Sequence, residues 1–181
     1  MEPRGLLMIE HRLIEKMLAV AGKAAASFQA AERIDPVFID SVVDFIRMYA
    51  DRTHHGKEED ILFKKLAAKK MEAEDTRMMQ ELIQEHVTAR VKVGELVEAK
   101  ERFLKNETRA IQDVIDRLSW LIDFYPLHIE KEDKVFFPRA ERYFTGRERE
   151  KMLAEFNEFD RRMIHEKYRR LVERLQAGAA E

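Results

Sequence analysis

The sequence contains no cysteine and few of the residues that favour turns. Among its 181 residues there are six glycines, four prolines and one tryptophan. The absence of cysteine excludes disulfide bonds, thiolate metal sites and thiol catalysis. Because a β-sheet protein of this length would need many more turn residues, the scarcity of Gly and Pro predicts long helices.

Neither sign of charge dominates, and long apolar runs are missing. The 33 Lys and Arg residues against 35 Asp and Glu residues leave a formal net charge of −2. Such a chain lacks the positive electrostatic field that attracts nucleic acid or an anionic membrane, so we expect neither as a partner. No apolar run approaches the roughly 18 residues of a membrane span, and the short N-terminal one, between Glu2 and Glu10, does not suit a signal peptide. We therefore expect a cytoplasmic protein.

Hydrophobic residues recur at helical spacing along nearly the whole chain and predict five helices. The expected ranges are about 4–30, 36–71, 75–105, 107–137 and 146–176. Pro126 falls inside the fourth helix and should kink it or remove a backbone hydrogen bond. The break between the second and third helices, expected around 73–75, carries no Gly or Pro.

Polar residues mark three of the expected helix starts. Asp35 precedes Pro36, an N-cap followed by proline at the first helical position. Asn106 can cap the fourth helix, and Thr145 with Glu148 forms a capping box for the fifth. The pattern predicts an all-α fold of one domain spanning 1–181. It is an up-down-up-down four-helix bundle over about 4–143, with an additional C-terminal helix over about 146–176.

The most informative feature is an internal repeat. Residues 55–60 and 128–133 both have the pattern His-x-x-x-Glu-Asp. Each is preceded, at nearly equal spacing, by an isolated Glu-His pair that ends in His11 or His86. The two halves therefore share one plan, a single histidine on one helix and His-x-x-x-Glu on the next.

The repeat places imidazoles and carboxylates together inside the expected bundle. Residues four apart share a helix face, and here that face continues the apolar stripe. Counting residues along the helices puts His11 level with His55 and His86 level with His128, each to within about 3 Å. The turn between His55 and His86 fits less well, and with its ends left open the four histidines lie near one level. Buried carboxylates need a metal or a dense hydrogen-bond network as compensation. The expected metal ligands are His11, His55, Glu59, His86, His128 and Glu132.

The ligand count predicts two metal ions if both carboxylates bridge them. Each ion would then receive two imidazoles and two carboxylate oxygens, with positions left for an oxo or hydroxo bridge and a small ligand. Mixed imidazole and carboxylate donors suit non-heme iron, with zinc or manganese as possible substitutes. The expected partner is thus a small diatomic or peroxide ligand.

These six residues resemble the ligand set of the hemerythrin family, in particular its HHE cation-binding branch. The resemblance covers roughly residues 4–140 and implies the hemerythrin four-helix bundle with a non-heme di-iron centre. Oxygen-carrying hemerythrins have a second histidine where this chain has Arg90, and they end their ligand set with an Asp, which here would be Asp133. The repeat favours Glu132 instead. The set is similar to that of di-iron proteins that repair iron–sulfur clusters.

The sequence predicts a di-iron protein that binds, senses or reacts with dioxygen, nitric oxide or peroxide. A role in iron-centre repair or in oxidative or nitrosative stress would follow from the resemblance. Two alternatives stay open, a non-catalytic binding module that the metal stabilises and an oxygen storage or carrier protein. The sequence leaves open whether the protein is an enzyme, its oligomeric state and its protein partners.

Other polar residues have simpler interpretations. His54 and Glu58 form a second i,i+4 pair, but their stripe carries charged residues and is expected to be solvated. Arg90 either forms an ion pair near the site or points outward. Tyr125 is expected to pack in the core, with a supporting role of its hydroxyl at the site as the alternative, and His165 is expected to be exposed.

Overall fold

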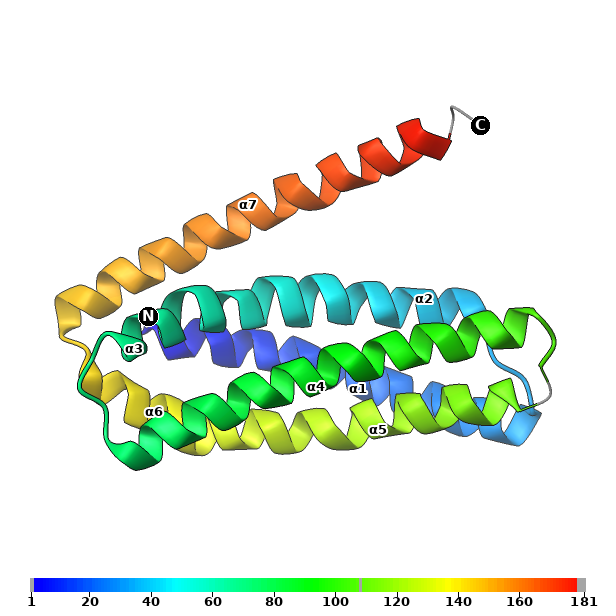
Figure 1. Ribbon diagram of the computed structural model, residues 1–181, viewed down its shortest axis with the longest axis horizontal. Coiled ribbons are helices and arrows are strands. Elements are labelled where there is room, and N and C mark those ends of the chain that lie inside the picture. Colours follow the sequence, from blue (N-terminus) through cyan, green and yellow to red (C-terminus); the bar gives the residue numbers. More distant parts are fainter. Residues whose placement is uncertain (1, 108, 179–181) are drawn as a thin grey trace.

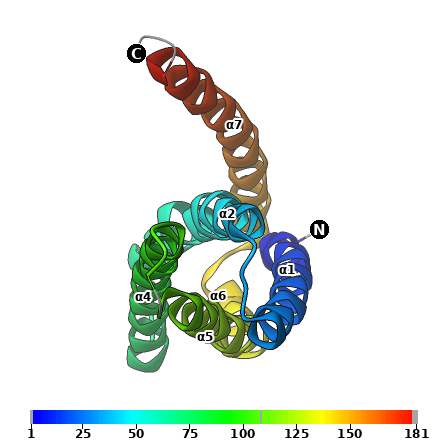
Figure 2. The same ribbon diagram turned by 90° about the vertical axis from the view of Figure 1, so that its right-hand side faces the viewer.

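The computed structural model describes residues 2–107 and 109–178, with side chains up to Met163, and every regular element in this part of the chain is helical. This confirms the all-α fold class. Four long helical runs lie side by side around a common core, and α7 (Gly146–Gly178) leaves them at an angle (Figures 1 and 2). The division into domains stays a prediction.

The four runs have these bounds. The first is α1 (Pro3–Ala31). The second combines α2 (Pro36–Phe45), η1 (Ile46–His55), η2 (Glu58–Phe63) and α3 (Lys64–Ala67), where η1 and η2 are π-helical. The third is α4 (Ala73–Leu104). The fourth combines α5 (Ala110–Lys131), the π-helical η3 (Glu132–Phe136), α6 (Phe137–Ala140) and the 3₁₀ turn η4 (Glu141–Tyr143).

Two expected boundaries were wrong. The second run ends at Ala67 and α4 begins at Ala73, so the break expected around 73–75 lies at 68–72. A tertiary contact holds the first turn of α4, because the buried Asp75 carboxylate accepts hydrogen bonds from the Tyr143 hydroxyl at 2.6 Å and from Arg139 at 3.1 Å. Asn106 does not cap the fourth run. It adopts a left-handed conformation (φ 62°) after α4, a conformation that asparagine tolerates well.

Other local expectations were confirmed. The Thr145–Glu148 capping box forms, with reciprocal bonds of 2.8 Å and 3.3 Å between backbone N–H groups and side-chain oxygens. α5 continues through Pro126, whose missing N–H leaves one backbone acceptor of the helix without its usual donor.

The apolar core forms two clusters, one on each side of a polar layer. On the first run, Leu7 belongs to one cluster and Ile14 to the other, with His11 between them. On α4, Leu82 and Ala89 flank the third-run histidine in the same way. The histidines therefore lie where four apolar stripes are interrupted at one level, with packed side chains above and below.

The first part of α7 packs against the bundle next to η1 and η2. Met152 and Phe156 are buried in the core cluster that also contains Leu7. Asp160 accepts a hydrogen bond of 2.6 Å from the fully buried Lys57. The N-terminal end of α7 is therefore part of the packed structure, beside the second run, which carries His55 and Glu59.

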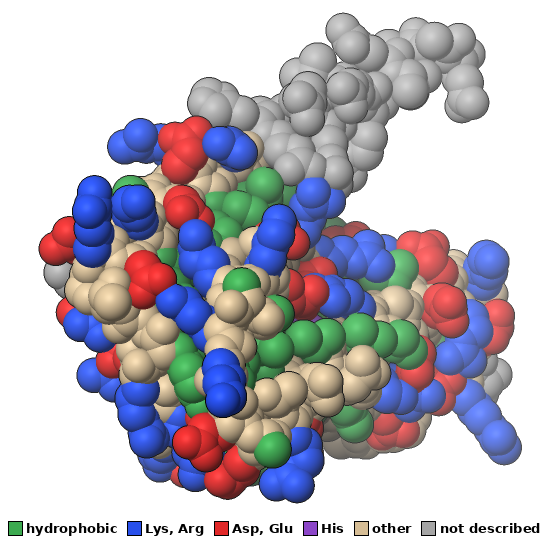
Figure 3. All heavy atoms as spheres, turned by 60° about the vertical axis from the view of Figure 1, so that its left-hand side comes forward, with side chains coloured by type: hydrophobic (Ala, Val, Ile, Leu, Met, Phe, Trp, Pro, Cys, Tyr) green, Lys and Arg blue, Asp and Glu red, His purple; other side chains and the backbone are tan. Residues whose placement is uncertain are grey.

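The surface carries both signs of charge. At the end where α3, α6 and the start of α7 lie, Lys and Arg side chains are interspersed with Asp and Glu (Figure 3). None of the helices in the described part of the chain is long and apolar enough to cross a membrane. The cytoplasmic location stays a prediction.

We expect Asp35→Ala to lower the free energy of unfolding by about 1 kcal/mol, which corresponds to about 2–4 °C in Tm. The Asp35 carboxylate accepts hydrogen bonds from the backbone N–H groups of Val37 and Phe38 at 3.0 and 3.2 Å. Thermal unfolding followed by circular dichroism measures the loss. Asp35→Ser keeps a capping oxygen and should retain most of the stability, so an equal loss in both variants would contradict this role.

Candidate metal centre

The second run widens into π-helical turns where its histidines lie. Buried residues recur there at intervals of four, at Ile46, Ala50, His54, Glu58 and Leu62. A π-helix needs more residues per turn than the 3.6 of an α-helix, so a four-residue step stays on one face. The wide turns also leave the neighbouring His55 buried. As a result, two adjacent histidines point into the bundle instead of one.

Five histidines share one arrangement. They come from all four runs, and each is at most 2% exposed. Each Nδ1 faces a carboxylate oxygen, in the pairs His11–Asp133 (2.7 Å), His54–Glu10 (2.9 Å), His55–Asp51 (3.3 Å), His86–Glu59 (2.8 Å) and His128–Glu85 (2.7 Å). Because an ionised carboxylate only accepts hydrogen bonds, each Nδ1 carries a proton and donates it. In the neutral ring, Nε2 then keeps a lone pair available for a metal ion.

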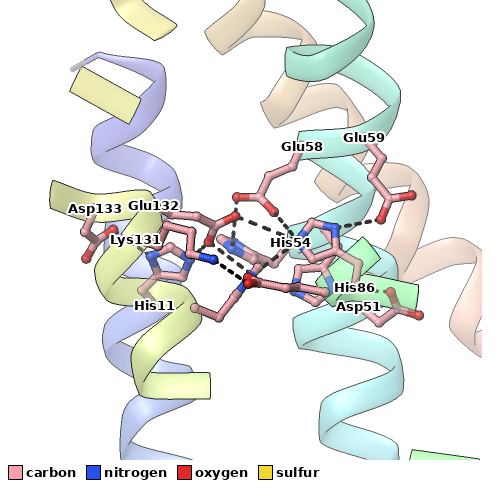
Figure 4. Close-up of polar contacts among 12 residues, drawn as sticks. His11, Asp51, His54, Glu58, Glu59, His86, Lys131, Glu132 and Asp133 are labelled. Atoms are coloured by element: carbon pink, nitrogen blue, oxygen red, sulfur yellow. Dashed lines mark hydrogen bonds and ion pairs between the residues drawn. The ribbon is translucent and has the colours of Figure 1, made fainter. Parts of the chain in front are cut away.

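Two fully buried carboxylates lie among the Nε2 atoms (Figure 4). The Glu58 oxygens are 3.4 Å from Nε2 of His54 and 3.5 Å from Nε2 of His86. One oxygen of Glu132 lies 3.2 Å from Nε2 of His11 and 3.3 Å from Nε2 of His128. Each carboxylate therefore lies between histidines on opposite sides of the site.

The inward-facing atoms separate into two groups. His55, His86 and His128 form one group, and the other consists of His11, His54, Glu58 and Glu132. Within each group, the candidate ligand atoms lie within 4.8 Å of one another. In the first group, Nε2 of His86 and Nε2 of His128 are 3.2 Å apart, and two lone pairs at this distance repel unless a cation or a proton lies between them.

The hydrogen-bonding state of these atoms fits a metal ion. Nε2 of His11, Nε2 of His54 and all four carboxylate oxygens of Glu58 and Glu132 are buried without a hydrogen-bond partner. Leaving such groups unsatisfied in a low-dielectric interior is costly. Imidazole nitrogens and carboxylate oxygens together are donors for iron, zinc or manganese, and two cations that share the carboxylates would satisfy all six atoms.

A further layer of cations surrounds the carboxylates that hold the imidazole rings. Lys57 pairs with Glu10, Arg12 with Asp133, Lys131 with Glu85, and Arg90 with both Asp51 and Glu59. These pairs lie nearer the surface than the histidines, except for Lys57, which is fully buried. Each ring is thus fixed through its carboxylate, the arrangement that orients metal-binding histidines and makes them better donors.

Burial and charge act differently on the individual groups. Burial lowers the pKa of His54 and of His55 well below the usual range, which keeps both imidazoles neutral. Burial also lowers the pKa of His11, but Asp133 and Glu132 more than offset it and raise the value to about 9. Burial, together with the nearby Glu132, raises the pKa of Glu58 well above normal. A negative charge on Glu58 is therefore unfavourable unless a cation lies beside it.

A comparison with known families agrees with this geometry. The hemerythrin HHE cation-binding domain matches residues 3–140, which is most of the chain. The chain belongs to the hemerythrin family. No curated protein and no solved structure matches it. The family resemblance drawn from the repeated His-x-x-x-Glu pattern is thereby confirmed, and the buried cluster of this hemerythrin-family protein could hold metal ions.

The structure brings together five of the six residues expected from the sequence, His11, His55, His86, His128 and Glu132. Glu59 lies outside both groups, with its side chain 27% exposed, and it contacts Nδ1 of His86 and the Arg90 guanidinium. Glu58 takes the inward place instead. The sequence argument assumed an unbroken α-helical phase, whereas the π-helical turns rotate the face by about one residue.

His54 and Glu58 were expected to be solvated, and this expectation was wrong. His54 is 1% exposed and Glu58 is not exposed at all. The available signal was the His54–His55 doublet followed by a carboxylate four residues after each histidine, which a wider helix could turn inward together. The ligand roles of all these residues stay proposals.

The remaining polar residues are also placed, with one exception. The Arg90 guanidinium lies 2.8 Å from Asp51 and 2.6 Å from Glu59, so it forms ion pairs at the edge of the site. Tyr125 is 1% exposed, and its ring stacks near His55 with centroids 6.4 Å apart. The side chain of His165 lies outside the described residues.

We expect Glu85→Ala to weaken metal binding by about 10- to 100-fold, because it removes the carboxylate that orients His128. Glu81→Ala is a matched control, since Glu81 contacts the same Lys131 but no histidine. Competition with a chelator of known affinity measures the difference. Equal weakening in the two variants would show that the surface ion pair, and not the oriented histidine, supports the site.

Proposed function

We propose that this hemerythrin-family protein holds two iron ions and uses them to bind, sense or react with dioxygen, nitric oxide or peroxide. The observation that carries the proposal is the pair of buried carboxylates without hydrogen-bond partners between two groups of histidines. His55, His86 and His128 would hold one ion, and His11 with His54 the other. Glu58 and Glu132 would be shared, in the up-down-up-down bundle of hemerythrins.

The donor count leaves room for a small ligand. If each carboxylate gives one oxygen to each ion, five imidazoles and four oxygens fill nine of about twelve octahedral positions. The sequence-based count of four imidazoles left more positions free, and the buried His54 accounts for the difference. Iron bound in this way supplies redox chemistry toward small oxidants, with zinc or manganese as possible substitutes.

Aromatic side chains of the chain pack against three of the histidines. Phe137 stacks on His11, Phe63 on His86 and Phe124 on His128, with ring centroids 5.6–6.1 Å apart. These rings cover one face of each of the three imidazoles and limit their movement. The carboxylates behind each Nδ1 prevent tautomer exchange, so Nε2 stays directed into the site. Such a site admits a small molecule without large rearrangement.

Anaerobic purification, metal analysis and stopped-flow mixing test the proposal. We expect about two irons per chain, the near-ultraviolet absorption of a bridged iron pair, and a rapid spectral change with at least one oxidant. Protein that stays free of iron after iron-replete expression would contradict the proposal. An iron centre inert to all three oxidants would instead favour a metal-stabilised binding module, and a stable, reversible oxygenated form would favour oxygen storage.

A further inference from the structure

A pocket of about 340 Å³ opens between η1 and α4 next to the three-histidine group. His55 and His86 form part of its wall. A water molecule occupies about 30 Å³ in the liquid, so the pocket is far larger than a diatomic ligand or peroxide needs. Its size falls at the lower end of the range for sites that bind small organic molecules.

The floor and the mouth of this pocket differ in chemistry. Apolar side chains from three runs line it, and among them Ile46, Ala89, Val93 and Tyr125 are buried. Arg47, Arg52 and Arg90 also line it together with one acidic residue, Asp51, and Arg90 is paired both with Asp51 and with Glu59, which lies outside the lining. Arg47 is exposed, and the side chain of Arg90 is 38% exposed, which places these cations toward solvent. An apolar floor with a cationic mouth suits an amphipathic anion.

Arg90 connects the pocket wall to the proposed metal centre. Its guanidinium is held by Asp51, the hydrogen-bond partner of His55, and by Glu59, the partner of His86. The guanidinium is therefore fixed in position, and less side-chain entropy is lost when an anion arrives.

We propose that this pocket binds a small organic monocarboxylate, with the carboxylate at the arginines and the apolar body over Ala89, Val93 and Tyr125. A planar guanidinium matches a carboxylate in geometry as well as in charge. The ligand's apolar body then lies beside His55 and His86. Binding of the ligand does not depend on the proposed function, because the chain's own residues line the pocket. Only the ligand's role beside a metal centre rests on that function.

Isothermal titration of the purified full-length protein with benzoate and with its neutral isostere benzamide tests this inference. We expect benzoate to bind at least about tenfold more tightly than benzamide, since several arginines contribute. Arg47→Glu should weaken benzoate binding by about fivefold or more, because a favourable charge becomes a repulsive one. Arg33→Glu is the matched control, because it makes the same charge change at an exposed position outside the pocket lining.

A second variant tests the pocket volume. Met48→Trp places a larger side chain at a half-buried lining position and should reduce benzoate binding, with circular dichroism confirming that the protein is folded. Absence of benzoate binding, equal affinity for benzamide, or equal effects of Arg47→Glu and Arg33→Glu would each overturn the inference. Metal content is measured on the same samples. Two metals without benzoate binding would reject the pocket alone, and benzoate binding without metal would reject the metal centre alone.

Discussion

Glu58→Gln protein is expected to retain at most one metal ion per chain under iron-replete conditions, whereas Glu59→Gln protein retains two. Glu58 is fully buried, and its oxygens lie 3.4 and 3.5 Å from Nε2 atoms of the two histidine groups. The substitution removes a negative charge from the middle of the proposed site and replaces one of the two carboxylate oxygens with an amide NH2 group, which cannot bind a metal ion. Because both ions would share this carboxylate, its loss weakens both positions.

The neighbouring carboxylate provides the control. Glu59 contacts Nδ1 of His86 and not Nε2, so it orients a proposed ligand without facing the ions. Its neutralisation should cost about 10- to 100-fold in affinity, which saturating iron overcomes. Elemental analysis of the two variants, with Glu132→Gln expected to behave like Glu58→Gln, separates the assignments. Retention of two ions by Glu58→Gln and their loss from Glu59→Gln would restore the assignment based on regular α-helical spacing.

Removal of each metal ion is expected to lower Tm by about 8–16 °C. Binding to the folded state alone contributes about 4 kcal/mol when the free metal is at 1,000 times Kd, and each kcal/mol shifts Tm by about 2–4 °C in a chain of this size. The metal-free site also leaves six buried polar atoms without partners. Differential scanning calorimetry before and after chelation, and again after iron is restored, measures the shift and its reversibility.

Glu58→Gln also tests the origin of this stabilisation. In the metal-free protein, burial and the nearby Glu132 raise the pKa of Glu58, so this carboxyl group is an unfavourable place for charge. The amide removes that cost, and metal-free Glu58→Gln should be at least as stable as the metal-free parent. Chelation should then shift its Tm less than it shifts that of the parent. An equal chelation-induced shift in both proteins would place the stabilising metal elsewhere.

The fold class could be predicted from the sequence because apolar periodicity is a local property of the chain. The expected second helix begins at Pro36 as its cap predicts, and the Thr145–Glu148 box forms. The boundary near Ala73 was misplaced because Tyr143, distant in sequence, bonds to Asp75 and holds the first turn of α4. A contact between such distant positions leaves no periodic signal.

By itself, the sequence determined that the chain folds as helices and that repeated His and Glu residues interrupt their apolar faces at one level. His11, His86, His128 and Glu132 follow from regular helical phase, and the structure places them as expected. Only the tertiary structure decided that His54 and Glu58 also face inward, because they lie in π-helical turns, which are rare and have no clear signal in the local sequence pattern. Only the assembled bundle, likewise, shows which distant carboxylate supports each imidazole and where a pocket reaches the histidines.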